Sequence, residues 1–230
     1  LTDVQTITIT VTDANDAPSI TSASTASVAE NQTAAIDVDH TDADSDVITY
    51  TLTGSVDDGL FDIDSGTGVV TFKTAPNFEL AGDVGGDNDY VIEVTATDGG
   101  SGNLTDVQTI TITVTDVNDA PSITSASTTS VAENQIAAID VNHTDDDGDT
   151  ITYTLTGSVD DGLFDIDSGT GVVTFKTAPN FEVAGDVGGD NDYVIEVTAT
   201  DSGSGNLTDV QTITITVTDV NDAPSITQQA

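Results

Sequence analysis

The chain has 230 residues and a formal net charge of −39 at pH 7, with 41 acidic residues, two lysines and no cysteine. Nucleic-acid binding needs a basic surface, and an anionic membrane surface would repel this chain, so both partners are excluded. No apolar run approaches the roughly 20 residues that cross a bilayer, and without cysteine there is no disulfide, thiol nucleophile or zinc–thiolate site.

The chain repeats itself. The segment LTDVQTITITVTD begins at Leu1, Leu104 and Leu207, so the period is 103 residues. Residues 1–103 and 104–206 differ at only nine positions, which is typical of a spacer or multivalent binder rather than an enzyme. A unit of this length suits one independently folding domain. Because Leu1 falls inside the pattern and no signal peptide is visible, we expect a fragment of a longer array.

Each period is predicted to be all-β. In chain order, the expected strands of the first copy are 6–11, 19–21, 35–38, 47–53, 60–63, 69–72 and 90–97. In 90–97 the alternation of polar and apolar residues places Tyr90, Ile92, Val94 and Ala96 on one face. Asp/Gly/Ser/Asn clusters between the strands are turn chemistry. About seven short strands in this length predict a Greek-key β-sandwich. Its expected aromatic core is Tyr50, Phe61, Phe72, Phe78 and Tyr90.

The repeats set the expected domain boundaries. Residues 1–16 are predicted to be the last strand and linker of a preceding repeat, 17–119 and 120–222 two full repeats, and 223–230 the start of another. A strand within residues 1–13 would lack its native neighbours. We therefore expect that segment to be frayed, or paired with another chain.

The acidic residues are mostly of one type. Six of the 41 are Glu, and the remainder are Asp. The short Asp side chain holds its carboxylate close to the backbone, which suits turns and loops that bind hard cations. Most Asp residues cluster at strand ends. This predicts cation sites at the two ends of each sandwich.

Five acidic motifs occur in register in both periods. They are AEN at 29–31, NFE at 77–79, DVNDAP at 116–121, DDDGD at 145–149 and ATD at 199–201, each with its copy in the other period. In this order they resemble the extracellular cadherin repeat. The resemblance is closest to the cadherin-like repeats of large bacterial surface adhesins of the RTX or biofilm type, whose linkers often read VNDAP.

The resemblance covers both full periods. It implies a cadherin- or immunoglobulin-like sandwich, a location outside the cell, either on its surface or secreted, and Ca²⁺-dependent adhesion. It also implies three Ca²⁺ ions at each junction between successive repeats. Apart from any family, Ca²⁺ takes six to eight oxygen ligands from carboxylates, amides and backbone carbonyls, which this composition supplies.

The resemblance also implies a ligand set. For the junction between the two full repeats it comprises Glu30, Asn77, Glu79, Asp116, Asn118, Asp119, Asp145, Asp147 and Asp201. The preceding junction would use Asp13, Asn15, Asp16, Asp42, Asp44 and Asp98, and the following one Glu133, Asn180, Glu182, Asp219 and Asp222. Asn77 and Asn180 stand where the family usually has Asp. This lowers the charge of the outermost ion site.

Other sites are less favoured by the sequence. An EF-hand loop beginning at Asp42 is excluded, because Val47 stands where that loop needs Gly. The acidic loop 83–89 occurs once per period and cannot stack as an RTX-type calcium repeat, so it is expected to be solvated, with an accessory surface ion as the alternative. His40 and His143 have no second His or nucleophile nearby in sequence, so both are expected to be structural or solvent-facing.

The sequence thus predicts Ca²⁺-rigidified extender repeats of a surface adhesin, with neighbouring repeats of the same chain as partners, and no enzyme activity. The alternative is a ligand-binding module for homophilic protein contact or for polysaccharide. Sandwich domains that bind glycans usually do so through exposed aromatic residues, often Trp, and this chain has no Trp.

Overall fold

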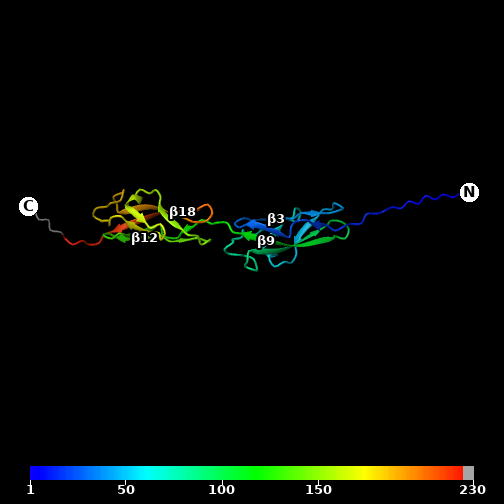
Figure 1. Cartoon of the computed structure of the whole chain (residues 1–230), viewed down its shortest axis with the longest axis horizontal. Coiled ribbons are helices and arrows are strands. Elements are labelled where there is room, and N and C mark those ends of the chain that lie inside the picture. Colours follow the sequence, from blue (N-terminus) through cyan, green and yellow to red (C-terminus); the bar gives the residue numbers. More distant parts are fainter. Residues whose placement is uncertain (225–230) are drawn as a thin grey trace, which may run out of the picture. The chain divides into compact units, whose positions relative to one another are not determined.

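The structure is a computed structural model that describes residues 1–224, and its regular secondary structure is almost entirely β-strand (Figure 1). It divides into two compact units, Leu1–Val117 and Asn118–Ala230. Within residues 1–224, helix is limited to two 3₁₀ turns, Asp58–Leu60 and Asp161–Leu163. No helix within the described residues has the length and apolarity to cross a membrane. The predicted all-β tandem architecture is confirmed, whereas most of the predicted start at 223–230 lies outside the described residues.

The first unit has nine strands. They are β1 (Ser19–Ile20), β2 (Thr25–Ala29), β3 (Ala34–Asp37), β4 (His40–Thr41), β5 (Thr49–Leu52), β6 (Phe61–Ile63), β7 (Val69–Phe72), β8 (Asp89–Thr97) and β9 (Thr105–Thr115). A four-stranded sheet in the order β2-β9-β8-β5 and a three-stranded sheet in the order β3-β7-β6 form the two main layers. β1 and β4 make a separate two-stranded ribbon. The count exceeds the expected seven because β2 and the two-residue β4 have no strong sequence signal.

The second unit repeats this topology. Its strands are β10 (Ser122–Ile123), β11 (Thr128–Ala132), β12 (Ala137–Asp140), β13 (His143–Thr144), β14 (Thr152–Leu155), β15 (Phe164–Ile166), β16 (Val172–Phe175), β17 (Asp192–Thr200) and β18 (Thr208–Thr218). The sheet orders are β11-β18-β17-β14, β12-β16-β15 and β10-β13. Each functional feature can therefore be checked in two copies.

The core lies between the two main sheets. Ile92, Val94 and Ala96 on β8 are fully buried and Tyr90 is 2% exposed, which confirms the predicted inner face. The Phe72 ring packs nearly perpendicular to Tyr90 at 5.2 Å, a favourable edge-to-face arrangement. Four of the five predicted core aromatics are buried. The fifth, Phe78, is only half-buried, because it stands on a loop at the edge of the sandwich.

One sequence appears in three environments. The copies of LTDVQTITITVTD at 104–116 and 207–219 contain all of β9 and all of β18, and each strand pairs with neighbours on both sides. At residues 1–13 the same letters form no strand, and Ile7, Ile9 and Val11 are 76%, 85% and 91% exposed. Strand formation here depends on cross-strand partners rather than on local propensity, as the frayed-segment expectation supposed.

Strand pairing sorts the acidic motifs to opposite ends of each unit. β2 and β9 are parallel, with Ala29 opposite Thr115, so Glu30 and Asp116 leave adjacent strands at the same end. β8 runs antiparallel to β9, and Thr97 lies opposite Thr105. Asp98 therefore follows β8 at the other end, where the loop after β4 also lies.

Candidate metal centres

One acidic cluster lies where β2 and β9 end. We call Glu30, Glu79 and Asp116, with their copies Glu133, Glu182 and Asp219, the C-end clusters. In each copy, one oxygen from each of the three side chains lies within 4.8 Å of the others. Two oxygens bound to the same Ca²⁺ at about 2.3–2.6 Å can be about 5 Å apart at most. Three carboxylates in this arrangement can therefore share one cation.

Glu30 anchors this end of the first unit. It is 3% exposed, and its Oε2 and Oε1 accept hydrogen bonds from the N–H groups of Phe78 at 2.8 Å and Val117 at 2.9 Å. The carboxylate therefore ties the NFE loop to the segment after β9. In the second unit, the corresponding N–H groups of Val220 and Phe181 lower the pKa of Glu133 and keep its carboxylate ionised.

The NFE asparagines differ between the two units. Asn77 Oδ1 accepts a hydrogen bond from Leu80 N–H at 2.6 Å, so in the first unit it closes a turn. Asn180 Oδ1 is buried, and none of the described residues donates a hydrogen bond to it. The two copies thus use the same oxygen differently.

The other end of each unit carries an N-end cluster. We define it as Asn15, Asp16, Asp42, Asp44, Asp46 and Asp98 in the first unit, and Asn118, Asp119, Asp145, Asp147, Asp149 and Asp201 in the second. In each copy, oxygens of the three loop aspartates (42, 44, 46 or 145, 147, 149) lie within 4.8 Å of one another. The structure therefore gathers the predicted DxD residues and adds a third carboxylate that the sequence prediction missed.

The linker residues contact this cluster directly. Asn118 Nδ2 donates to Asp201 Oδ2 at 2.9 Å, and Asp119 N–H donates to Asp147 Oδ2 at 2.6 Å. In the first unit the same two contacts join Asn15 to Asp98 and Asp16 to Asp44. The linker residues therefore contact the acidic residues at this end of each unit. Asp13 and Asp222 belong to none of the acidic groups found among residues 1–224.

Each N-end cluster holds one buried carboxylate oxygen that lacks a donor among the described residues. Asp145 Oδ1 accepts the Asp149 N–H at 2.9 Å, but Asp145 Oδ2 is buried with no hydrogen-bond partner among the described residues. Asp42 Oδ2 is in the same state. Burying an anionic oxygen without a hydrogen-bond donor lowers the free energy of unfolding, because the lost hydration is not replaced. Because each of these oxygens belongs to a group of three neighbouring carboxylates, it suits a hard cation such as Ca²⁺.

The electrostatics of the cluster also favour a cation. Burial, together with the charges of Asp42, Asp98 and Asp44, raises the pKa of Asp46. Both lysines make their ion pairs elsewhere, Lys73 with Asp62 and Lys176 with Asp165, each at 3.8 Å. The crowded carboxylates therefore repel one another, and a bound cation would relieve that repulsion.

The acidic loop 83–89 is not simply solvated, and that expectation is wrong for Asp83. Asp83 is only 7% exposed, and its two oxygens accept N–H groups from Gly86 and Asn88 at 2.5 Å and 3.0 Å. The loop folds around this carboxylate because the backbone donors replace its hydration. Asp186 does the same in the second unit. These carboxylates hold the loop rather than a metal.

Asp186→Asn is expected to lower the melting temperature at neutral pH and to lose that effect in acid. Burial alone would raise the pKa of Asp186, but the N–H groups of Asp190, Asn191 and Gly189 outweigh it and set the pKa below its usual value. A lowered folded-state pKa stabilises the fold above the ordinary value of about 3.9, and the gain disappears as pH falls through the folded pKa.

Thermal unfolding in chelator across an acidic pH series measures this difference. Asp165→Asn, which neutralises an exposed side chain of the same unit, is the control. A deficit for Asp186→Asn that persists unchanged into strong acid would contradict the prediction.

The histidines have a structural role, as expected. His40 Nδ1 forms a hydrogen bond with Tyr50 Oη, and His143 forms the same bond with Tyr153. The buried tyrosine hydroxyl thereby gains a partner at the edge of the core.

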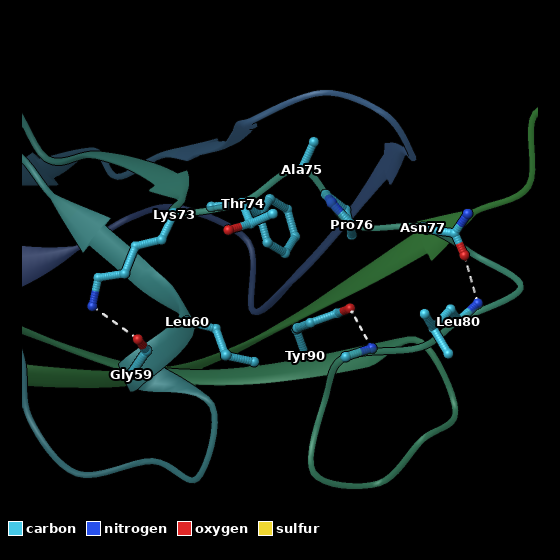
Figure 2. A pocket seen from close by; sticks show the side chains of 11 residues that line it. Gly59, Leu60, Lys73, Thr74, Ala75, Pro76, Asn77, Leu80 and Tyr90 are labelled. Carbon is cyan, nitrogen blue, oxygen red and sulfur yellow. Dashed lines mark hydrogen bonds between the residues drawn. The ribbon is translucent and has the colours of Figure 1, made fainter.

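A pocket of about 480 Å³ lies between the segment that follows β7 and the residues Leu60, Leu80 and Tyr90 (Figure 2). Its lining is mostly apolar and includes Leu60, Pro76, Leu80 and Tyr90. At its rim, Lys73 Nζ donates to the Gly59 carbonyl at 2.8 Å. No His or carboxylate lines the pocket, and its Lys73 and Tyr90 contact the backbone, Lys73 through the Gly59 carbonyl and Tyr90 through the Gly82 N–H. The second unit has an equivalent pocket.

Sequence comparison with known proteins identifies the family of these repeats. The family description "Cadherin domain" matches residues 23–115 and 124–218. Human protocadherin Fat 1 is 32% identical over 183 residues, and mouse protocadherin Fat 2 is 33% identical over 183 residues. Each match covers 76% of this chain but only 4% of the relative.

Solved structures show the same architecture. Human protocadherin-24 EC1-2 has a TM-score of 0.59 at 20% identity, covering 90% of this chain and all of that one. Mouse cadherin-23 EC22-24 has a TM-score of 0.54 at 24% identity, covering 91% and 68%. At these identities the likeness concerns the fold.

Proposed function

This chain belongs to the cadherin family, and on that premise we propose that its acidic clusters bind Ca²⁺ and that the ions order successive repeats of an extracellular adhesion protein. Cadherin domains are modules of adhesion proteins and not enzymes. The match covers only 4% of the length of Fat 1 and of Fat 2. Adhesion by the whole protein that contains this chain is therefore proposed here.

The observation that carries the proposal is the buried Asp145 Oδ2, which lacks a donor within a group of three carboxylates. Ca²⁺ would be held there by Asp145, Asp147, Asp201 and the linker residues Asn118 and Asp119. Its role would be to supply the positive charge that the side chains lack. Because the carboxylates repel one another without it, ion binding and ordering of the site should be coupled.

Sequence adjacency supports sharing of ions between repeats. Asp116 belongs to the C-end cluster of the first unit and Asn118 to the N-end cluster of the second. Only one residue separates them, so their Cα atoms are at most about 7 Å apart. We propose that Glu30, Asn77, Glu79 and Asp116 serve the same group of ions as the second unit's cluster, with up to three ions in all. The outer clusters would serve further repeats in the same way.

We further propose that these repeats are extenders of a large surface adhesin, of the kind found in bacteria. The proposal is supported by the nine differences between two whole periods and by the VNDAP linkers, which suit a spacer more than a set of specialised domains. Ca²⁺ affinity should lie near the 10⁻⁴–10⁻³ M that is typical of extracellular modules.

A glycan- or protein-binding module remains the alternative prediction. The rings of Tyr50, Phe61, Phe72 and Tyr90 are at most 4% exposed, so they offer no stacking surface for a sugar. Homophilic contact would appear as Ca²⁺-dependent dimerisation in analytical ultracentrifugation.

Isothermal titration calorimetry with Ca²⁺ tests the proposed function. Wild type should bind Ca²⁺ in the expected affinity range, and Glu79→Gln should bind it more weakly, since it removes a charged ligand from the C-end cluster. Glu93→Gln is the matched control, because Glu93 lies on the outer face of β8, where it accepts a hydrogen bond from Thr53. No binding by wild type, or equal effects of the two variants, would contradict the proposal.

A further inference from the structure

We infer that the carboxylate of Asp149 supplies an additional Ca²⁺ ligand, and that its copy Asp46 does so in the first unit. In each unit this carboxylate lies next to the side chain of the linker asparagine, in the space above a glycine. The inference rests on the proposed function, and it names residues outside the ligand set that the family resemblance implies. Asp149 would raise the affinity of the N-end site by adding one more anionic oxygen.

The loop conformation brings Asp149 into the cluster. Its backbone N–H donates to Asp145 Oδ1 at 2.9 Å, which folds the loop back on itself. One oxygen each of Asp145, Asp147 and Asp149 then lies within 4.8 Å of the others. The Ser202 hydroxyl donates to Asp149 Oδ1 at 3.1 Å, so this oxygen is held and Oδ2 is left for another partner.

A glycine provides the space for that second oxygen. A Cβ atom on Gly203 would overlap both Asn118 Oδ1 and Asp149 Oδ2, so these two oxygens converge over the glycine. The first unit shows the same arrangement, in which Gly100 leaves room for Asn15 Oδ1 and Asp46 Oδ2. Neither glycine has a positive φ, so the backbone does not require glycine here. Glycine is needed because any larger residue would occupy the space that the two oxygens fill.

The two converging oxygens need a positive partner. Asn118 Nδ2 donates to Asp201 Oδ2, which turns Asn118 Oδ1 toward Asp149. An amide oxygen and an ionised carboxylate are both acceptors, so neither can donate a hydrogen bond to the other. Rotating the amide by 180° would only move the conflict to Asp201. A cation between Asn118 Oδ1 and Asp149 Oδ2 satisfies both oxygens at once.

The chain provides a matched control in the same loop. Asp146 carries the same charge, is exposed, and is outside the group of three carboxylates. The first repeat has Ala43 at the equivalent position, so the loop does not need an acidic side chain there. Asp146→Asn therefore removes one charge close to the site without removing a ligand.

Calorimetric Ca²⁺ titrations of the 230-residue chain test the inference. The double variant Asp46→Asn/Asp149→Asn should lose about ten-fold or more in affinity at the affected sites, whereas Asp146→Asn should match wild type. Europium luminescence lifetimes, which report the water molecules bound to the ion, should show added water in the double variant only.

Gly203→Ala is a second, independent variant. Its Cβ would displace the ends of two flexible side chains rather than backbone, so the chain should fold in chelator and bind Ca²⁺ less tightly. Gly162→Ala is its control, since a Cβ there meets nothing within 4 Å.

The outcomes separate this inference from the proposed function. If wild type binds Ca²⁺ and the double variant binds it equally well with no added water, the inference is overturned and the proposed function stands. If wild type binds no Ca²⁺, both are overturned.

Discussion

Removing Ca²⁺ is expected to lower the melting temperature of this chain by about 10 °C or more. One ion present at 100 times its Kd adds about 2.7 kcal/mol to the free energy of unfolding. For a domain of about 100 residues, 1 kcal/mol shifts the melting temperature by roughly 4–8 °C. The N-end cluster of the second unit should contribute strongly, because Asp145 Oδ2 gains its missing partner there.

Differential scanning calorimetry in Ca²⁺ and in chelator measures this shift. Ionic strength must be matched, because a chain of net charge −39 is also stabilised by screening of its self-repulsion. Mg²⁺ at the same concentration controls for any divalent cation, since it prefers a smaller octahedral site that retains water. Equal melting temperatures in Ca²⁺ and in chelator would contradict the prediction.

Asp160→Asn is expected to destabilise the second unit by about 1–3 kcal/mol, with or without Ca²⁺. Asp160 is 1% exposed, and its two oxygens accept the N–H groups of Val187 and Val194, each at 2.8 Å. Asn offers one oxygen, so its amino group would face a backbone donor and leave that donor unsatisfied. Because the two bonds join the 183–191 loop to β17, their loss should loosen that loop first.

Chemical denaturation in Ca²⁺ and in chelator checks this expectation. Asp165→Asn is the matched control: it removes an exposed partner of Lys176 at 3.8 Å and should change stability by less than about 0.5 kcal/mol. The first unit keeps the equivalent Asp57 and serves as an internal reference. A Ca²⁺-dependent effect of Asp160→Asn, or one no larger than the control, would show that Asp160 does not have this structural role.

Sequence reasoning was most reliable where one physical signal dominated. The alternation from Tyr90 to Ala96 correctly predicted the buried face of β8. The same signal failed to predict β2, because TASVA has no aromatic residue and only one β-branched apolar side chain, Val28. The identical segments at 1–13 and 104–116 show the limit directly, since only the second has partner strands.

The acidic sites were predictable in outline only. Motif order predicted that Glu30, Glu79 and Asp116 would meet, and the structure brings them together. Residue type alone could not distinguish these candidate metal ligands from Asp57 and Asp83, which are also carboxylates in turns but bind backbone N–H groups. The difference lies in their partners: the oxygens of Asp57 and Asp83 accept backbone N–H groups from distant or folded-back segments, which depend on the completed fold.

The large negative charge has a corresponding explanation. Some carboxylates, such as Asp160, are satisfied by backbone donors, and others, such as Asp62, lie exposed to solvent. A third group meets in the end clusters, where Asp42 and Asp145 each keep a buried oxygen without a donor. A composition that is typical of disorder is therefore compatible with a packed sandwich, provided that cations join the third group.

Small-angle X-ray scattering of the whole chain tests the central claim most directly, because shared ions should fix one repeat relative to the next. The comparison is between millimolar Ca²⁺ and chelator at matched ionic strength. We predict a longer maximum dimension and a narrower distance distribution in Ca²⁺. Superimposable curves under the two conditions, at concentrations where calorimetry shows Ca²⁺ bound, would contradict the account.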